Sequence, residues 1–305
     1  MRAILLSETG GPERLKPGEL PEPEPGEGQA LVRIRAAGVN FLDLLVRSGN
    51  YPQSPPLPLV PGVEIAGEVN GRRVIAMLPA SGGYAEAAAV DEHRLYPLPD
   101  GASFEEGASF LLTYLTAYIP LTRQVRVGPG TTVLVHAGSG GVGSAAIQVA
   151  RHFGARVVAT ASSEEKRGFA LEQGAEEAYG YEDFAEHVRP DVVLDPVGGK
   201  VLAATLPTLA PLGALVAIGS AGGWWEELNP ALLVGRNIGL HGFYLGRLTG
   251  RNPEVVDEAA RDLLRLWAEG AIRPVVGATF PLEQAAAAHT LIEERRHVGK
   301  VVLVP

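Results

Sequence analysis

Short apolar runs separated by turns fill the chain between Ala30 and Pro99. Runs of this length, bounded by clusters of Gly and Pro, predict the strands of a small β-rich domain. The loop from Tyr51 to Pro61 is too dense in proline to be a central strand, so we expect it on the surface or at the rim of a cleft. The strand-like runs are LVRIRAAGV, EIAGEV, RRVIAML and YAEAAAV.

The pattern changes at Ser103. Ser103 and Glu106 have the spacing of a capping box, and the apolar stretch after them predicts a long helix that reaches about Leu121 and crosses between domains. Beyond it, strand-like and helix-like runs alternate, which indicates βαβ units around a parallel sheet. The strand-like runs are TVLVHAG, RVVATA, DVVLDPV, ALVAIGS and IGLHGFYL, and the helix-like runs are VGSAAIQVARHF, EEKRGFALEQG and VLAATLPTLA.

The C-terminal stretch returns to shorter elements. The pattern predicts an amphipathic helix from about Pro253 to Gly270, a strand near Ile272 to Phe280, a further helix and a terminal strand VVLVP. We expect this stretch to rejoin the first domain.

Composition narrows the class of protein. With 305 residues the chain exceeds the roughly 250 at which single cores stop growing, which favours two domains. The net charge of -9 provides no basic surface for nucleic acid or for an anionic membrane. The apolar run before Glu8 is too short for a signal peptide, and no run is long enough to span a membrane, so we expect a soluble cytoplasmic protein.

The chain has no cysteine, which excludes disulfides and a thiol nucleophile. Any metal would have to be held by His and carboxylates, yet none of the seven His residues has the spacing of a metal-ligand motif. Ordinary surface or core roles are therefore expected for the histidines.

The strongest local motif is a glycine-rich turn that follows one predicted strand and opens a predicted helix. In a G-x-G-x-x-G turn the first glycine permits the bend, the second lets a pyrophosphate approach, and the third allows helix to pack on strand. The alternative is a tight turn with no ligand. The motif consists of Gly138, Ser139, Gly140, Gly141, Val142 and Gly143.

The end of the next strand favours NADP(H) over NAD(H). An NAD site places an acid there, roughly twenty residues after the turn, whereas this chain has Ala159 to Ser163, followed by Lys166. Small hydroxyl residues and a lysine can accept a 2′-phosphate. Lys166 is equally compatible with a solvated helix position, and Glu164 and Glu165 would lie just inside the helix.

Together these segments resemble the quinone oxidoreductase and ζ-crystallin branch of the medium-chain dehydrogenase/reductase superfamily along nearly the whole chain. The resemblance implies an α/β protein with a GroES-like catalytic domain of residues 1–113 and 249–305 and a Rossmann NADP(H)-binding domain of residues 114–248. The segments that carry it are AAGVNFLDLLVRSGNYP, PGVEIAGEV, LTAY, VLVHAGSGGVGSAAIQVA, DPVGG and GKVVLVP.

The same resemblance argues against a catalytic zinc ion. Zinc-dependent relatives take one ligand from a Cys that corresponds to Asn40 here, and another from a His that corresponds to Val63, although Glu64 is retained. A zinc site needs about three protein ligands. The chain also lacks the four-cysteine lobe that holds a structural zinc in those relatives.

The resemblance assigns three residues to the nicotinamide and substrate region, namely Asn40, Asp43 and Tyr51. Tyr51 is the best-placed polar proton donor, with a packing aromatic as its alternative. Asn40 is equally interpretable as the turn residue that closes its strand.

The resemblance also implies the remaining cofactor contacts. Thr116, Gly219 to Ala221 and Gly242 to Tyr244, including Ser220 and Phe243, would lie near the nicotinamide. The 2′-phosphate pocket would use Ser162, Lys166, Tyr181 and Arg295, although the residue before Tyr181 is Gly180 where the family often has Asn.

These features predict an NADPH-dependent quinone reductase that uses no metal, because a conjugated quinone accepts hydride or electrons without a Lewis acid. The alternatives are an NADPH-dependent 2-alkenal or enone reductase and a non-catalytic NADPH-binding protein. The adjacent Trp224 and Trp225 would cover the substrate cleft, join a subunit contact or pack in the core. A sheet-edge strand near Ile238 to Tyr244 leads us to expect a homodimer.

Overall fold

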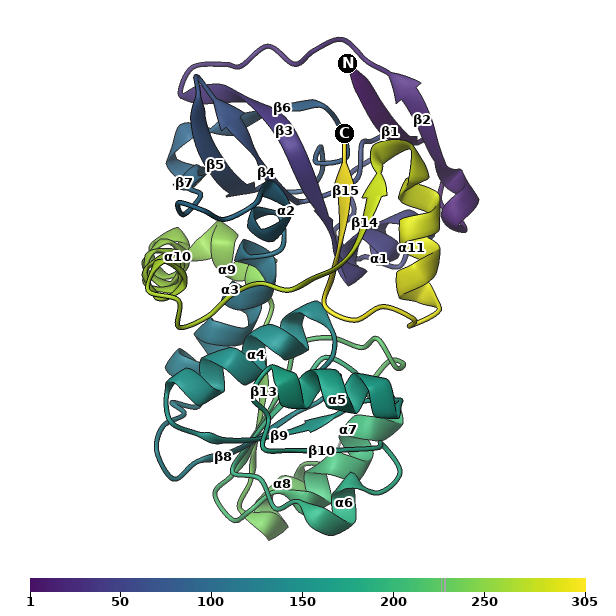
Figure 1. Cartoon of the computed structure of the whole chain (residues 1–305). Helices are drawn as coiled ribbons and strands as arrows, with labels where there is room; N and C mark the ends of the chain where they lie inside the picture. The colour runs from purple at the N-terminus through teal and green to yellow at the C-terminus, as the bar shows by residue number, and fades with distance from the viewer. Residues whose placement is uncertain (226, 228) are drawn as a thin grey trace. The chain divides into compact units, whose positions relative to one another are not determined.

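The computed structural model describes residues 1–225, 227 and 229–305. Contacts divide the chain into two compact units, Met1–Leu112 with Pro274–Pro305, and Thr113–Arg273. Figure 1 shows how the two ends of the chain, purple and yellow, meet within the first unit. Each unit is described by itself below.

The first unit is built on a mixed sheet with the strand order β14-β15-β3-β4-β5-β7, in which β6 also pairs with β3. The long β3 is its centre, and its side chains alternate between the core and solvent over its first half. The strands are β3 (Gln29–Val39), β4 (Glu64–Val69), β5 (Arg72–Met77), β6 (Ala87–Asp91), β7 (Tyr96–Pro97), β14 (Val276–Pro281) and β15 (Lys300–Val304).

The remaining elements of this unit cover or extend that sheet. The N-terminal strands form an antiparallel pair of their own, and Leu59 of the proline-rich loop bonds back to Leu6 at 2.9 and 3.0 Å. Most of the loop is exposed, which confirms its prediction as a surface segment. These elements are β1 (Arg2–Leu6), β2 (Leu15–Glu19), α1 (Phe41–Ser48), α2 (Phe104–Gly107), α11 (Ala285–Glu293), and the 3-10 turns η1 (Pro12–Arg14), η2 (Glu92–Arg94) and η5 (Leu282–Gln284).

The C-terminal strand completes the first unit, because β15 runs antiparallel to β3 with Val302 opposite Gly38. Fully buried apolar side chains, among them Val32, Ile65 and Leu303, form the core between the sheet and its covering helices. The predicted return of the C-terminal segment is confirmed for β14, α11 and β15.

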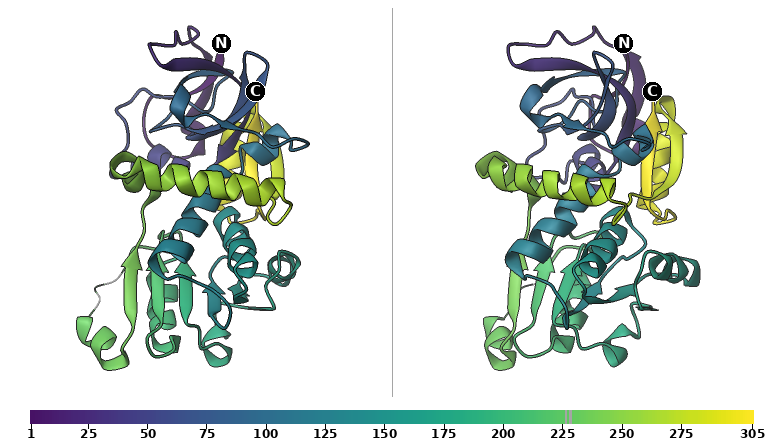
Figure 2. Two further views of the ribbon diagram at one scale, coloured as in Figure 1. Left: turned by 90° about the vertical axis from the view of Figure 1, so that its left-hand side faces the viewer. Right: turned by 60° about the vertical axis from the view of Figure 1, so that its left-hand side comes forward.

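The second unit is a doubly wound parallel sheet. Its strand order is β10-β9-β8-β11-β12-β13, so the order reverses at the first strand, β8. The strands lie side by side in teal and green in Figure 2, and they are β8 (Thr132–Val135), β9 (Arg156–Thr160), β10 (Glu177–Tyr179), β11 (Val192–Asp195), β12 (Ala214–Ala217) and β13 (Gly239–Gly242).

Helices cover both faces of this sheet. Crossovers between parallel strands are almost always right-handed, so the strand order places α4 and α5 on one face of the sheet and α6, α7 and α8 on the other. The predicted α/β class with a Rossmann sheet and a β-rich unit is confirmed. The helices are α3 (Leu111–Ile119), which begins in the first unit, the π-helix η3 (Pro120–Gln124), α4 (Gly141–His152), α5 (Glu164–Glu172), α6 (Phe184–His187), α7 (Gly199–Thr205), η4 (Leu206–Thr208), α8 (Pro230–Arg236), α9 (Leu245–Arg251) and α10 (Pro253–Ala268).

The long helix expected from Ser103 to Leu121 is broken. The capping box forms as predicted, with Ser103 Oγ accepting from Glu106 N–H at 3.1 Å, but α2 ends at Gly107 and α3 begins at Leu111. The intervening Ala108 and Phe110 are fully buried. Their packing in the core overrides the continuous helix that the apolar pattern predicts.

The second boundary between the units differs from the expected one, because residues 249–273 belong with the parallel sheet. The reason is the packing of α10. Tyr118 Oη donates to Asp262 Oδ2 at 3.1 Å, and Arg123 pairs with Glu258 at 2.9 Å, so α10 is held to the helical segment that precedes β8.

Helix α1 was not expected within the β-rich region. Asn40 and Asp43 form a capping box at its start, and Gly49 ends it in the left-handed conformation with a φ of 77°. Both signals are present in the sequence, but the strand-like runs around them dominate the local pattern.

Candidate functional site

The glycine-rich turn joins β8 to α4. Gly140 is the residue before the helix, and α4 begins at Gly141. A Cβ on Gly143 would lie 2.1 Å from the Ala137 carbonyl oxygen, and one on Gly138 would lie 2.8 Å from Ala159 Cβ. The protein's own packing therefore requires glycine at these two positions.

Gly140 differs from its neighbours in the turn. A Cβ there would have its nearest contact at 3.5 Å, an ordinary van der Waals distance, so the chain itself does not demand glycine. A free surface at this position suits the close approach of a pyrophosphate. The first N–H groups of α4 point out of the helix without acceptors in it, and together with the helix dipole they favour an anion.

Three of the four residues predicted to bind a 2′-phosphate follow β9 and β10 in the second unit. Ser162 is exposed just beyond the strand, and Ser163 caps α5 by accepting from the backbone N–H of Lys166 at 3.3 Å. Tyr181 follows the neighbouring strand β10, with its ring 6.2 Å from His136. Ser162, Lys166 and Tyr181 thus lie at the carboxyl ends of adjacent strands. Arg295, the fourth predicted residue, belongs to the first unit.

His136 is a buried polar residue beneath the turn that the sequence interpretation did not single out. Thr205 Oγ1 donates to the Val201 carbonyl at 2.6 Å, so it accepts from His136 Nε2–H at 2.8 Å, and Thr160 Oγ1 donates to Nδ1 at 2.8 Å. Burial lowers the pKa of His136 to about 3, which keeps the ring neutral. The ring links the ends of β8 and β9 to α7. The sequence signal that could have identified His136 is its position as the one polar residue inside the apolar run VLVHAG.

The other half of the sheet carries residues that the sequence analysis assigned to the nicotinamide, at the carboxyl ends of its strands. Asp195 ends β11, and its Oδ1 accepts from Val197 N–H at 2.7 Å and Gly198 N–H at 3.0 Å, which fixes the DPVGG turn. Gly219 and Ser220 follow β12, and Phe243 and Tyr244 follow β13. Thr116 lies on α3 and is half-buried.

A buried polar cluster occupies the end of β3 in the first unit. Lys300 Nζ donates to Asn40 Oδ1 at 2.8 Å and contacts Glu64 Oε2, while Asn40 Nδ2 donates to the same carboxylate at 3.3 Å. Glu64 Oε1 accepts from Leu112 N–H at 3.0 Å. The Lys300 and Glu64 charges neutralise each other, and the side chains of Asn40, Glu64 and Lys300 are all hydrogen-bonded.

A second chain of hydrogen bonds continues from Asn40. Its backbone N–H donates to Asp43 Oδ2 at 2.8 Å, and Tyr84 Oη donates to the same oxygen at 3.0 Å. His289 Nε2 lies 3.1 Å from Tyr84 Oη and therefore donates to it. Burial raises the pKa of Asp43 to about 6, and burial, with a smaller effect of Arg47, lowers the pKa of His289 to about 3.

The structure thus brings Asn40 and Asp43 together and adds residues that sequence reasoning missed. Tyr84, His289 and Lys300 come from distant segments, and Lys300 was visible only as the charged residue of GKVVLVP. Tyr51 is partly buried and packs against the core of the first unit, as its alternative interpretation predicts. Its role as a proton donor stays a prediction.

The residues at the zinc-ligand positions form no metal site. Val63 is buried and apolar, and the amide of Asn40 is engaged with Glu64 and Lys300. Among residues 1–225, 227 and 229–305, no group of three or more His, Cys, Asp or Glu side chains is arranged to hold a metal ion. In that same described part, no helix has the length and apolar character needed to cross a bilayer.

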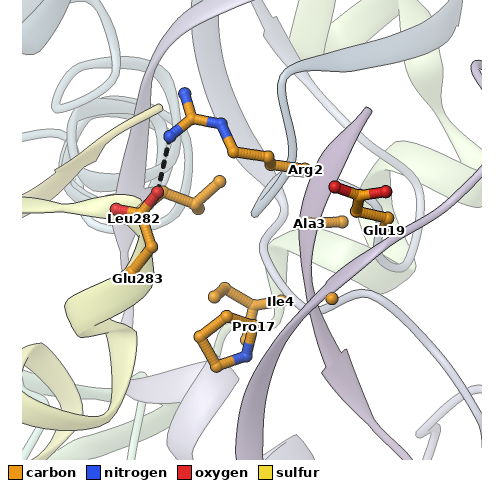
Figure 3. A pocket seen from close by; sticks show the side chains of 8 residues that line it. Arg2, Ala3, Ile4, Pro17, Glu19, Leu282 and Glu283 are labelled. Atoms are coloured by element: carbon orange, nitrogen blue, oxygen red, sulfur yellow. Dashed lines mark hydrogen bonds and ion pairs between the residues drawn. The ribbon is translucent and has the colours of Figure 1, made fainter.

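A hollow of about 250 Å³ lies elsewhere in the first unit, between β1, β2 and η5 (Figure 3). Arg2 Nη1 donates to Glu283 Oε1 at 2.6 Å on one side of it, and Ile4 and Pro17 are among its apolar lining residues. None of its lining residues belongs to the predicted site, and we assign it no function.

A doubly wound sheet with a phosphate-binding turn, next in sequence to a β-rich unit completed by the C-terminal strand, defines a dehydrogenase or reductase of the medium-chain type. Comparisons with known sequences agree with this class. Residues 26–100 match the alcohol dehydrogenase GroES-like domain family, and residues 173–303 match the zinc-binding dehydrogenase family.

Individual relatives narrow the class. The human quinone oxidoreductase is 33% identical over all of this chain and 98% of its own length, and the human synaptic vesicle membrane protein VAT-1 homolog is 34% identical over all of this chain and 86% of its own. The quinone oxidoreductase from Thermus thermophilus, solved also in complex with NADPH, is 42% identical over the whole of both chains with a TM-score of 0.93. The chain belongs to the quinone oxidoreductase-like branch of the medium-chain dehydrogenases/reductases.

Proposed function

We propose that this protein is an NADPH-dependent quinone reductase that works without a metal ion. The observation that carries the proposal is the hydrogen bonding of the Asn40 side chain. At the position where zinc-dependent relatives have a ligand, its side chain is bonded to Glu64 and Lys300 in a closed, charge-balanced cluster. A site with these donors suits an acceptor that needs no Lewis acid.

The cofactor assignment rests on the fit of the second unit to a dinucleotide with a 2′-phosphate. The turn from Gly138 to Gly143 would hold the pyrophosphate at the start of α4. Beyond β9 no acid occupies the position that would repel a 2′-phosphate, and Ser162, Lys166, Tyr181 and Arg295 would bind it. The NADPH complex of the Thermus thermophilus relative supports this choice.

The nicotinamide half would lie over the ends of β11, β12 and β13, with Gly219, Ser220, Phe243 and Tyr244 around it and Thr116 from α3. NADPH supplies the hydride or electrons. The chain's own contribution is to hold the acceptor in a reactive position, to which Asn40 and Asp43 would contribute. Protons would come from solvent or from Tyr51.

The test is to follow NADPH or NADH oxidation by the purified protein with an ortho-quinone, a 2-alkenal, and an alcohol in the presence of NADP⁺. Oxidation of NADPH with the quinone is the expected result. Preference for the alkenal would replace the proposal with an enone reductase, and nucleotide binding without turnover would indicate a non-catalytic NADPH-binding protein.

The proposal includes a homodimer formed through β13, which lies at the edge of the parallel sheet. An unpaired edge strand is a template for pairing with a second chain across a two-fold axis. Val234 on the preceding α8 is 77% exposed. An apolar side chain this exposed next to the edge strand supports a subunit contact there, in which the second chain would cover it. A location in the cytoplasm stays a prediction.

A further inference from the structure

Four polar side chains lie together in the hydrophobic core of the first unit. Asp43 and Arg47 are one turn apart on α1, Tyr84 lies between β5 and β6, and His289 lies on α11. None of the four residues is more than 2% exposed. Burying several polar groups in a core costs free energy that plain packing does not require, so the cluster is a candidate for a chemical role.

The hydrogen bonds of this cluster all have the same direction. Tyr84 Oη donates its only proton to Asp43 Oδ2 at 3.0 Å, so it accepts from His289 Nε2–H at 3.1 Å. Each donor thus faces the next acceptor, from His289 through Tyr84 to Asp43. A proton that enters at the histidine can pass along existing bonds to the carboxylate.

His289 Nδ1 is the outer end of this row. Since Nε2 carries the proton, Nδ1 has a free lone pair, and within the described part of the chain it has no hydrogen-bond partner. Nε and Nη1 of Arg47 are likewise buried and unpartnered there. Helix α1 packs against α11, and the Arg47 charge is, after burial, the second cause that lowers the pKa of His289.

Arg47 also connects this end of the row to the surface. Its Nη2 donates at 3.0 Å to Glu293 Oε1, and the Glu293 side chain is 50% exposed. An internal water molecule that accepts from Arg47 and donates to His289 Nδ1 would satisfy both groups. The row would then extend from the histidine toward solvent.

Asp43 is the inner end of the row. Its Oδ2 also accepts from the backbone N–H of Asn40 at 2.8 Å, and the family resemblance assigns both residues to the substrate region. Burial raises the pKa of Asp43 to about 6, which suits a carboxyl group that holds and releases a proton near neutral pH. The charges of Lys300 and Glu64 act on this pKa in opposite directions.

The backbone around Tyr84 keeps its hydroxyl in line. Its N–H donates to the Pro61 carbonyl at 2.8 Å, and its carbonyl accepts from Ile4 N–H at 2.9 Å. A Cβ on Gly62 would lie 2.4 Å from the ring, so the chain packs directly against the tyrosine.

We propose that His289 and Tyr84 form a proton relay that carries protons from solvent to Asp43 for reduction of the acceptor. This inference rests on the proposed quinone reductase function and adds the route of its proton. The relay residues act through Asp43, so they should affect turnover with little effect on the binding of NADPH.

The proton balance of the reaction fits such a relay. Hydride transfer from NADPH carries two electrons to a quinone and leaves NADP⁺ and a hydroquinone anion, which needs one proton. Asp43 gives its carboxyl proton to the oxygen of that anion. Tyr84 then returns a proton to Asp43, and His289 gives its Nε2 proton to Tyr84 while Nδ1 takes one from solvent. The relay is ready again once the ring has returned to the Nε2–H tautomer.

The first experiment breaks the middle of the relay. Tyr84→Phe should lower kcat for NADPH oxidation with para-benzoquinone roughly tenfold, and change KM and the calorimetric Kd for NADPH less than about twofold. The loss should be smaller with tetrachloro-para-benzoquinone, because its hydroquinone anion is less basic and depends less on a proton donor. Tyr118→Phe is the matched control, because Tyr118 Oη also donates to a carboxylate, Asp262, but outside the relay.

The second experiment separates a relay from a structural role. The amide of His289→Gln can still donate to Tyr84 Oη, but it cannot take up a proton on one side and release one on the other. A relay predicts the same loss of kcat in His289→Gln as in His289→Phe, with a larger solvent deuterium isotope effect than in the unchanged protein. Recovery of kcat in the glutamine variant would overturn the relay.

Nitrogen NMR of the nucleotide-free protein tests the direction of the row without turnover. We expect the Nε2–H tautomer for the ring of His289, identified by the loss of its signals in His289→Gln. The Nδ1–H tautomer would reverse the bond to Tyr84 and overturn the relay.

The outcomes distinguish this inference from the proposed function. If the unchanged protein reduces neither quinone, the proposed function fails and the relay fails with it. If it reduces both, but Tyr84→Phe and His289→Gln keep the kcat and the isotope effect of the unchanged protein, the relay is wrong while the reductase stands. Equal losses with the two quinones in Tyr84→Phe would also overturn it.

Discussion

The ion pair of Lys300 and Glu64 shows how one buried interaction can hold distant segments of the chain together. They lie 236 positions apart in sequence, and both are almost completely buried beside Asn40. A buried ion pair adds little net stability to the fold, because both charges lose their hydration. Removing one partner is costly, because it leaves the other charge buried and unpaired.

We therefore expect Lys300→Met to reduce the free energy of unfolding by about 3 to 5 kcal/mol. The double variant with Glu64→Gln should recover part of this loss, because it no longer buries an unpaired carboxylate. Urea unfolding followed by circular dichroism measures both. An unchanged unfolding midpoint in the single variant would contradict the paired state of Lys300.

The buried histidines and Asp43 predict how stability depends on pH. The pKa of His136 and that of His289 are lowered from 6.5 to about 3, so the unfolded chain takes up protons that the folded chain does not. Stability should fall as the pH drops below about 6.5. Asp43, which faces Tyr84, Lys300 and Glu64, has the opposite effect, because its pKa is raised from 3.8 to about 6.

The prediction is a decrease in Tm between about pH 7 and pH 4, and a steeper decrease in Asp43→Asn. The variant loses the carboxylate that takes up a proton in the folded state over the window from about 6 to 3.8. Comparing the slopes of Tm against pH removes any constant effect of the substitution. Parallel slopes for the two proteins would show that Asp43 has an ordinary pKa.

At the scale of elements, the turn between β8 and α4 separates structural glycines from a ligand-facing one. Gly143→Ala would place a Cβ 2.1 Å from a carbonyl oxygen, whereas Gly140→Ala has its nearest contact at 3.5 Å. The two substitutions should therefore act on different properties.

We expect Gly143→Ala to destabilise the protein by roughly 1–3 kcal/mol. Gly140→Ala should change stability by less than about 1 kcal/mol but weaken NADPH binding roughly tenfold or more, because its methyl group meets the pyrophosphate. Thermal unfolding and calorimetric titration with NADPH measure the two effects. Gly128→Ala is the control, since a Cβ there has no neighbour within 4 Å. Equal NADPH affinity in the Gly140 and Gly128 variants would argue against the phosphate site.

The elements also show where local pattern fails. The runs TVLVHAG, VGSAAIQVARHF and RVVATA correspond to β8, α4 and β9, because each has enough apolar periodicity to specify its type. The stretch after Ser103 is equally apolar and predicts one continuous helix. The helix is interrupted between Gly107 and Leu111, because the side chains of Ala108 and Phe110 are buried in the core. Local pattern indicates a helix there but not its interruption.

At the scale of the whole molecule, the dimer prediction concerns the surface beside β13. Val234→Glu should have little effect on an isolated chain, since the side chain is 77% exposed, but it would bury a charge in a subunit contact formed there. We expect the variant to have the mass of a monomer by light scattering where the unchanged protein is a dimer. Leu171→Glu is the control, because Leu171 is 44% exposed on α5, on the opposite face of the sheet. A dimeric Val234→Glu variant would place the contact elsewhere.

The sequence alone determined the features that depend on short stretches of chain. Apolar periodicity specified most strands and helices, and the alternation after Ser103 specified a parallel sheet. Gly138 to Gly143 could be assigned to a phosphate-binding turn because its glycines, its strand and its helix are contiguous. The absence of an acid between Ala159 and Ser163 is likewise a local fact.

Tertiary structure decided everything that depends on which distant segments meet. It joined Asn40, Glu64 and Lys300 in one cluster, linked His136 to Thr160 and Thr205, and assigned α10 to the parallel sheet. It also exposed the tryptophan pair at the edge of the sheet. The physical reason is that hydrogen bonds and burial are set by strand pairing and helix packing, which a local pattern does not specify.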